Sequence, residues 1–474
     1  MSKLISKTLG SLLLAASCSA PLQAENLAEI YQLALTNDAQ LRAAHAAYNA
    51  GKQAIPRARA RILPTLTGSI ELTDGDGDTS SARTLNFPGQ TFEAGASGSN
   101  DDETEFYSLS LSQPLFDLPA WFIFKQGFDL DKQATANLAA EQQSLIVRVV
   151  GTYTEVLRTS EDLITAKAEQ RAIGRQLEQT KERFEVGLLP ITDVHEAQAA
   201  FDAARVNTLE AEGALDIAFE GLEVLTGKPY SELAGLAAEF PIKPTEPADP
   251  AAWVEFAQSN NFNLAAARLN MQAAEKNSRA KRAEHLPKVS AHINYSNYHR
   301  EGSFDIDSAT TNQPFSEDNE PLVFSVRMNA PLYTGGLVSA ERKIAQQNFI
   351  EAQENLLLAK RQTTQQARSQ HLKVSTNSAR VSARALGIIS AQSALEATQA
   401  GYDVGTRNIV DLLISQRVLY RSQRDYANAR YDYIISMFNL KEVAGLLSPD
   451  DINTLNTWMK PELVVGKSAS RVKL

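Results

Sequence analysis

The chain has 474 residues, a formal net charge of −10 and 43% hydrophobic residues. This hydrophobic content is typical of a folded protein and excludes an intrinsically disordered chain. An acidic chain of this kind lacks the excess of positive charge that binds phosphate backbones, so we expect no nucleic-acid partner. The sequence contains no Gly-rich phosphate loop, no Ser-His-Asp order and no activated cysteine. We therefore expect a protein that is not an enzyme and has no cofactor.

Residues 1–24 have the pattern of a secretory signal peptide. Lys3 and Lys7 precede a short apolar run, and the small residue Ala24 ends the segment. The run is shorter than the about 20 apolar residues that a membrane-spanning helix needs. The only cysteine, Cys18, lies in this segment, which leaves two alternatives: removal with the leader, or acylation as the first residue of a lipoprotein.

One long helix is predicted near the start of each half of the chain. Residues 26–60 and 252–284 are rich in Ala, Leu, Gln and Arg, and each stretch leads into a Leu-Pro pair, Leu63-Pro64 and Leu286-Pro287. After each proline the apolar residues recur at every second position, which indicates β-strands with one apolar face. Two further alternating segments follow, around Leu109 and Phe324.

These four strands are each about ten residues long, the length that a tilted transmembrane strand requires. Alternation of this length also occurs in soluble sandwiches. The signal peptide and the aromatic residues at the strand ends favour the membrane alternative. Residues 73–105 are polar and contain Asp74, Asp76 and Asp78 between glycines. A calcium loop would need a bidentate Glu at a fixed spacing. This segment lacks one, so we expect a solvated external loop.

Very long helices are predicted at 125–184 and 339–402, where proline is absent and Ala, Gln, Leu and Glu dominate. About 60 residues of helix span roughly 90 Å at 1.5 Å per residue, longer than the core of a compact domain. Returning helices are expected at 191–226 and 408–445. Periodicity of this length indicates coiled-coil or repeat packing.

The sequence is duplicated around an aromatic-x-Val-Gly motif. Gly187 and Gly405 are separated by the same interval as Gly227 and Gly445, which marks an internal repeat. The organisation expected is therefore a signal peptide at 1–24, a first repeat at 25–227, a Pro-rich linker at 228–250, a second repeat at 251–446 and a flexible C-terminal tail at 447–474.

This arrangement closely resembles the TolC family of outer-membrane efflux and secretion channels. The resemblance covers about residues 25–446. Its most specific sequence motifs are RFEVGL at 183–188, ITDV at 191–194, GYDVGTR at 401–407 and IVDLL at 409–413. It implies a mainly α fold with a membrane β part: a homotrimer whose protomers each supply four transmembrane strands to one 12-stranded barrel, continued by a long periplasmic α-helical barrel. It also implies an outer membrane location in a Gram-negative cell.

The resemblance also implies partners and a mode of action. The channel would be a passive exit duct for a tripartite efflux pump or for type I protein secretion, with outer-membrane lipid around it. A periplasmic adaptor protein and an inner-membrane efflux pump or ABC exporter would open its periplasmic end. The Gly187-Leu188 and Gly405-Thr406 turns match the tips that contact the adaptor.

Gate residues follow from the same match. Tyr402 and Arg407 match the movable partners of a periplasmic latch, Thr192 and Asp193 match their acceptors, and Gln176 fits a lock position. Asp411 matches an acidic ring at the pore constriction, where close like charges attract cations. The sequence departs from the family pattern at two positions that usually carry carboxylates, Gln399 and Ile414.

The sequence also allows a metal site and a different function to be considered. Asp193 and Glu196 share a helix face at i, i+3, but His195 points elsewhere, so we expect no metal site there. A periplasmic coiled-coil adaptor or scaffold without a pore is the alternative function, since adaptors also contain long helical hairpins. Such an adaptor would not need strands that alternate at transmembrane length.

Overall fold

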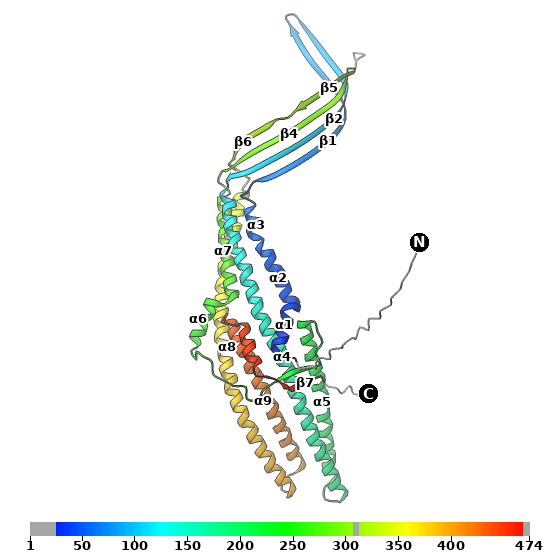
Figure 1. Ribbon diagram of the computed structural model, residues 1–474, viewed down its shortest axis with the longest axis vertical. Helices are drawn as coiled ribbons and strands as arrows, with labels where there is room; N and C mark the ends of the chain where they lie inside the picture. The colour runs from blue at the N-terminus through cyan, green and yellow to red at the C-terminus, as the bar shows by residue number, and fades with distance from the viewer. Residues whose placement is uncertain (1–24, 307–311, 468–474) are drawn as a thin grey trace, which may run out of the picture. The chain divides into compact units, whose positions relative to one another are not determined.

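The computed structural model describes residues 25–306 and 312–467 (Figure 1). The expected signal peptide, with Cys18, lies outside the described residues. The chain divides into two compact units, each built from segments that are distant in the sequence. Unit 1 comprises residues 1–44, 139–261 and 362–474, and unit 2 comprises residues 45–138 and 262–361.

Helices make up most of unit 1, whereas unit 2 combines helices with strands in similar amounts. Unit 2 also contains the large sheet, and unit 1 contains a small two-stranded one. The helices, in chain order, are α1 (Leu27–Asn37), α2 (Ala39–Lys52), α3 (Ala54–Arg59), α4 (Leu118–Glu185), α5 (Ile191–Thr226), α6 (Pro250–Asn260), α7 (Phe262–Ala283), α8 (Leu337–Asp403), α9 (Ile409–Val443) and α10 (Pro449–Asn456).

The very long helices and their returning partners are confirmed. Helix α4 has 68 residues and α8 has 67, and the expected ranges differ from the observed ones mainly at the start of α4. In unit 1 the α4–α5 and α8–α9 hairpins reverse direction at the two glycine turns (Figure 1). No helix in the described part of the chain is long and apolar enough to cross a membrane.

The single helices expected at 26–60 and 252–284 are wrong: the first is interrupted at Asp38 and again at Gln53, and the second at Asn261. Asp38 ends α1 in an extended conformation, and its carboxylate accepts the Leu41 N–H at 2.6 Å. Asn261 separates α6 from α7 with nearly the same backbone angles, and its amide donates to the Val443 carbonyl. Asp and Asn favour such positions because their short side chains bond to the backbone of a helix end.

The large sheet consists of β1 (Thr65–Phe87), β2 (Gln90–Phe116), β4 (Lys288–Ile306), β5 (Asn312–Asn319) and β6 (Leu322–Asn329). All its pairs are antiparallel in the order β1-β2-β4, and β5 and β6 follow one another along the far edge of β4. The expected external loop at 73–105 is wrong. β1 and β2 pair without a break from Thr65 and Ser112 to Phe87 and Gln90, because the hydrogen bonds of a strand pair join backbone groups and do not require an apolar sequence.

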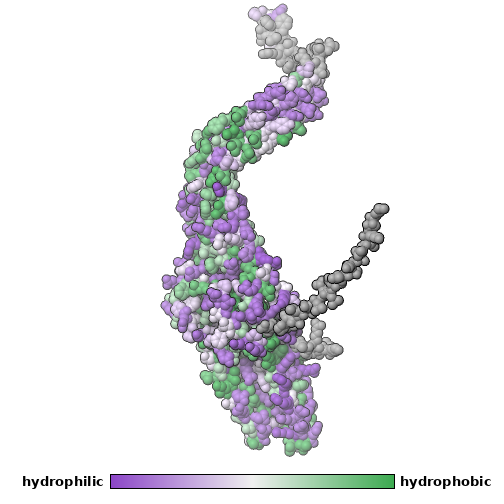
Figure 2. Space-filling view, in the orientation of Figure 1, coloured by the Kyte–Doolittle hydropathy of each residue, from purple (hydrophilic) through white to green (hydrophobic). Residues whose placement is uncertain are grey.

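The alternation of apolar and polar residues is confirmed by the register. Leu66, Leu111, Ile293 and Phe324 form one row across the four strands, and the next row carries Thr67, Ser110, Asn294 and Val323. The first row lies on an exposed apolar face; Leu66 is 63% exposed and Phe324 67%. Figure 2 shows hydrophobic residues gathered on the part of the sheet next to α3 and α7, and hydrophilic residues beyond it.

The expected flexible tail is wrong for residues 449–466. Helix α10 buries Ile452 and Leu455, and strand β7 (Met459–Gly466) pairs with β3 (Glu232–Leu236), which lies inside the Pro-rich linker. The first described residue, Glu25, bridges to the same strand. The Pro-rich linker holds no long helix, as expected, but β3 makes it part of the fold of unit 1.

Truncation of the α10 core should therefore destabilise the protein. Ile452 is fully buried, and Ile→Ala in a core typically costs about 2–5 kcal/mol. We expect Ile452→Ala to lower the thermal unfolding midpoint of the detergent-solubilised protein, while the exposed neighbour Asn453→Ala leaves it within error. Equal midpoints for the two variants would mean that the tail does not contribute to the fold.

Candidate functional site

The two glycine turns of unit 1 share one geometry. Gly187 has φ 77° and Gly405 φ 78°, values that only glycine adopts without strain. In each turn the following amide bonds back to a helical carbonyl at 2.9 Å: Leu188 N–H to Arg183, and Thr406 N–H to Gly401. The adjacent apolar side chains are solvent-exposed, Val186 at 70%, Leu188 at 72% and Val404 at 76%.

Tyr402 lies just before the second turn and is buried at 6% exposure. Its ring belongs to an apolar cluster that joins α4, α5, α8 and α9: Ile173, Ala200, Ala204, Tyr402, Ile409, Leu412 and Leu413. The Tyr402 hydroxyl is buried without a hydrogen-bond partner. The Nε2 of Gln176, which is 4% exposed, is likewise buried and unpartnered. Buried polar groups are usually satisfied, whereas these two have no hydrogen-bond partner within the described chain.

The other predicted latch residues lie at the surface. Arg407 places Nη1 3.6 Å from Asp411 Oδ2, one helical turn away. The Thr192 hydroxyl donates to Asp193 Oδ1 at 3.4 Å. Within the described chain the structure thus brings Arg407 to Asp411 and Thr192 to Asp193, but it does not join Arg407 or Tyr402 to either predicted acceptor.

Asp411 occupies the first turn of α9. Its backbone N–H donates to the Asn408 side chain at 2.8 Å, which caps the helix. A carboxylate in the first turn is favoured by the helix dipole. The Asn408 cap therefore fixes the position of the Asp411 backbone. The Asp411 side chain is half-buried.

One contact between the two hairpins was not predicted from the sequence. Arg183, in the last turn of α4, places Nη2 3.3 Å from Oδ1 of Asp403, the last residue of α8. Its guanidinium also lies 5.3 Å from the centre of the Tyr402 ring. The sequence offered one indication of this contact: both charged residues lie inside the repeated motif, Arg183 in the copy at 183–187 and Asp403 in the copy at 401–405.

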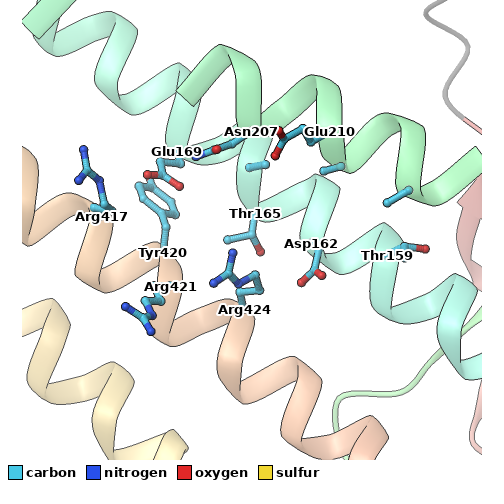
Figure 3. Close-up of a pocket in the computed structure, with 13 residues that line it drawn as sticks. Thr159, Asp162, Thr165, Glu169, Asn207, Glu210, Arg417, Tyr420, Arg421 and Arg424 are labelled. Carbon is cyan, nitrogen blue, oxygen red and sulfur yellow. The ribbon is translucent and has the colours of Figure 1, made fainter. Parts of the chain in front are cut away.

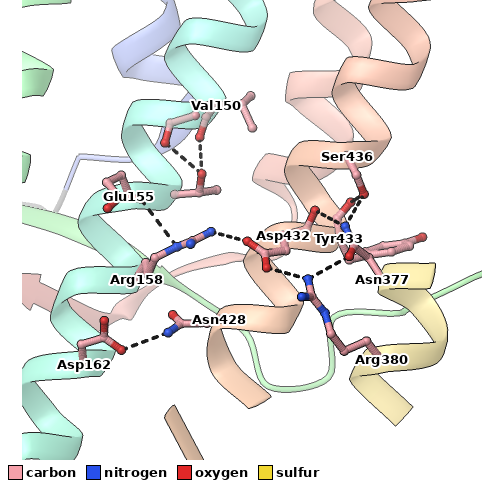
Figure 4. A network of polar contacts seen from close by, with 12 residues as sticks. Val150, Glu155, Arg158, Asp162, Asn377, Arg380, Asn428, Asp432, Tyr433 and Ser436 are labelled. Atoms are coloured by element: carbon pink, nitrogen blue, oxygen red, sulfur yellow. Dashed lines mark hydrogen bonds and ion pairs between the residues drawn. The ribbon is translucent and has the colours of Figure 1, made fainter. Parts of the chain in front are cut away.

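A polar network joins α4, α8 and α9 farther from the tips (Figure 4). Asp432 accepts from Arg158 on α4 at 2.6 Å and from Arg380 on α8 at 2.7 Å. Asn377 on α8 donates to the Asp432 carbonyl, and Asn428 on α9 donates to Asp162 on α4. Because one carboxylate holds two arginines, this network fixes the three helices relative to one another inside unit 1.

Between this network and the apolar cluster lies a cavity of about 430 Å³. Figure 3 shows side chains of α4, α5 and α9 around it: Thr159, Asp162, Thr165, Glu169, Asn207, Glu210, Arg417, Tyr420, Arg421 and Arg424. Burial raises the pKa of the Glu169 carboxyl and of the Asp162 carboxyl, while nearby arginines oppose the rise. Charged groups of both signs thus line a partly desolvated gap.

Among residues 25–306 and 312–467, no three His, Cys, Asp or Glu side chains gather closely enough to hold a metal ion. Asp193, His195 and Glu196 follow one another on the first turns of α5 without forming such a group.

Comparison with known proteins decides between a channel and an adaptor. The outer membrane efflux protein family matches residues 30–228 and 253–446. The chain belongs to this family. A relative from Vibrio cholerae, named outer membrane protein TolC, is 36% identical and covers 96% of this chain and 97% of its own. The alkaline protease secretion protein AprF of Pseudomonas aeruginosa is 29% identical over 89% of this chain and 85% of its own.

Solved structures agree with the fold. The outer membrane protein VceC of Vibrio cholerae superposes with a TM-score of 0.69 at 16% identity, covering 88% of this chain and 96% of that one. Its family and its relatives make the chain an outer-membrane protein and a transport channel, which confirms the predicted location and the expectation that it is not an enzyme. The alternative interpretation, a periplasmic adaptor or scaffold without a pore, is wrong.

The raised pKa of Glu169 makes the stability of unit 1 depend on pH. A carboxyl whose pKa is higher in the folded state binds more protons there than in the unfolded chain, so stability falls as pH rises through and above about 4. We expect Glu169→Gln to raise the thermal midpoint by a few degrees or less at pH 7. The gain should disappear near pH 4.

The exposed Glu396→Gln on α8 is the matched control, and it should change the midpoint at neither pH. A Glu169→Gln variant that is less stable than wild type at pH 7 would show that the ionised carboxylate is held favourably in the cavity.

Proposed function

We propose that the protein is the outer-membrane exit duct of a tripartite efflux pump or a type I secretion system, and that it works as a homotrimer. The observation that carries this proposal is similarity over most of the chain to the outer membrane efflux protein family and to a relative named for protein secretion, the alkaline protease secretion protein AprF. Which cargo passes depends on the inner-membrane pump or ABC exporter that docks.

The sheet supports a trimer. In the described chain β1 pairs only with β2 and β6 pairs only with β4, so both edges of the sheet carry backbone groups without strand partners. Such edges are not tolerated in lipid. Joining the β1 edge of one copy to the β6 edge of the next closes the sheet, and three copies of four strand positions give the 12 strands expected from the sequence.

The latch proposal rests on groups that the single chain leaves unsatisfied. The Tyr402 hydroxyl and Gln176 Nε2 are buried and unpartnered, and Arg407 is 62% exposed with one ion pair at 3.6 Å. In the trimer Tyr402 and Arg407 would bond to Thr192 and Asp193 and hold the tip end closed. Exposed pairs contribute under about 1 kcal/mol each, so a docking partner can release several of them.

The turns at Gly187-Leu188 and Gly405-Thr406 are proposed as the adaptor contacts. Val186, Leu188 and Val404 expose apolar surface there, and both turns present backbone in a conformation set by glycine. A periplasmic adaptor with complementary hairpin tips would cover these side chains. Asp411, close behind the second turn, is proposed as the constriction ring, where three copies would attract cations.

The latch is tested by conductance of the purified protein in planar lipid bilayers. Tyr402→Phe removes a hydroxyl that would donate in the latch, and Arg407→Ser removes the cation. Because each link is worth under about 1 kcal/mol, we expect each variant to raise the probability of the open state by up to about fivefold, and the double variant to raise it further.

Tyr420→Phe is the matched control, since Tyr420 lines the cavity and lies outside the latch. It should conduct like wild type. A double variant Tyr402→Phe/Arg407→Ser with wild-type conductance would remove both residues from the gate, and the absence of any conductance in wild type and in every variant would contradict the duct itself.

A further inference from the structure

We propose that Arg183 and Asp403 form a second, intrachain clamp that positions Tyr402 and ties the tip of α4 to the tip of α8. The Arg183–Asp403 clamp deepens the gate described above and rests on that proposed function. It is formed within one chain, whereas the proposed Tyr402 and Arg407 links are not joined in the single chain.

The geometry gives one side chain two roles. Arg183 Nη2 lies 3.3 Å from Asp403 Oδ1, and the same guanidinium lies 5.3 Å from the Tyr402 ring centre. Arginine suits this position because its planar, delocalised cation can pair with a carboxylate and stack on an aromatic face together. Arg183 therefore contacts two consecutive residues of α8 from the end of α4.

Gln399 completes the arrangement on α8. Its Nε2 donates to both carboxylate oxygens of Asp403, at 3.3 and 3.4 Å. A carboxylate at position 399, one turn before Asp403, would repel it, whereas the neutral amide orients it towards Arg183. The neutral amide of Gln399 therefore allows Asp403 to stay ionised next to it and to pair with Arg183.

The clamp determines how Tyr402 is held. One part of the ring packs in the apolar cluster with Ile409 and Leu412, and the guanidinium of Arg183 approaches it as well. The hydroxyl itself has no partner in the chain. Holding the ring from both the cluster and the cation restricts where the hydroxyl can point, so loss of the clamp would free the Tyr402 side chain to move.

The clamp is built to be reversible. The Arg183 and Asp403 side chains are 38% and 48% exposed, and exposed ion pairs are weak and screened by salt. The α4–α5 and α8–α9 hairpins each reverse at their own glycine, so side chains rather than a short backbone connection join Arg183 to Asp403. Loss of the clamp would let the α8 tip and Tyr402 move without unfolding either hairpin.

The experiment is single-channel recording of the full-length protein in planar bilayers at low and high salt. We expect Arg183→Gln and Asp403→Asn each to raise the open probability about two- to fivefold at about 0.1 M salt, since exposed pairs are worth under about 1 kcal/mol. The exchange variant Arg183→Asp/Asp403→Arg should recover part of the closed state, because it restores the pair but not the stacking on Tyr402. Arg183→Lys, which keeps the charge and loses the planar group, should be intermediate.

Salt gives a readout that a merely structural role would not move. At about 1 M salt, where the Debye length is about 3 Å, wild type should approach the single variants. Arg279→Gln is the matched control, since Arg279 forms an exposed ion pair with Glu275 within α7, and it should conduct like wild type at both salt concentrations.

The outcomes separate the clamp from the latch. If Arg407→Ser opens the channel while Arg183→Gln and Asp403→Asn match wild type, the clamp is overturned and the latch stands. If the clamp variants open the channel and Arg407→Ser does not, the clamp stands and the latch assignment of Arg407 fails. An exchange variant as open as the single variants would overturn the pairing of Arg183 with Asp403.

Discussion

The structure depends on one constraint, the pairing of backbone groups at the edges of the large sheet. β1 and β6 each have one strand partner in the described chain, yet the face that includes Leu66 and Phe324 is apolar and exposed. In lipid such edges must be paired, so a single copy cannot form the membrane part alone. We infer that the edges are paired by further copies of the chain, which is the basis of the trimer proposed above.

The duplicated halves share backbone geometry and differ in chemistry. The φ values of Gly187 and Gly405 are nearly equal, but Arg183 on the first copy corresponds to Gly401 on the second, where a Cβ would meet the Arg407 side chain at 2.8 Å. One copy therefore supplies a cation that crosses to the other hairpin, and the second makes room for its own arginine. The gating proposals all rest on these differences rather than on the repeat.

Much of the fold could be predicted from the sequence, because long stretches without proline and strict alternation leave few other structures. The helix breaks at Asp38 and Asn261 were missed, since a capping side chain outweighs good helical composition on either side. The strands through 73–105 and the α10–β7 tail were missed because their pairing partners lie far away or carry no apolar signal. The Arg183–Asp403 pair could not be found from one sequence, because contact between two hairpins is set by tertiary packing.

The most direct test of the account is disulfide trapping across the proposed subunit boundary. Thr67 on β1 and Val323, Ser325 and Arg327 on β6 lie on the polar face of the sheet, and the only native cysteine is Cys18, far from both strands in the sequence. Thr67→Cys would be combined with cysteine at each β6 position in turn, and the protein oxidised in its membranes. The account predicts covalent products that reach three chains and stop there for at least one pair. A chain that stays monomeric with all three pairs, or a ladder that continues beyond three, would contradict it.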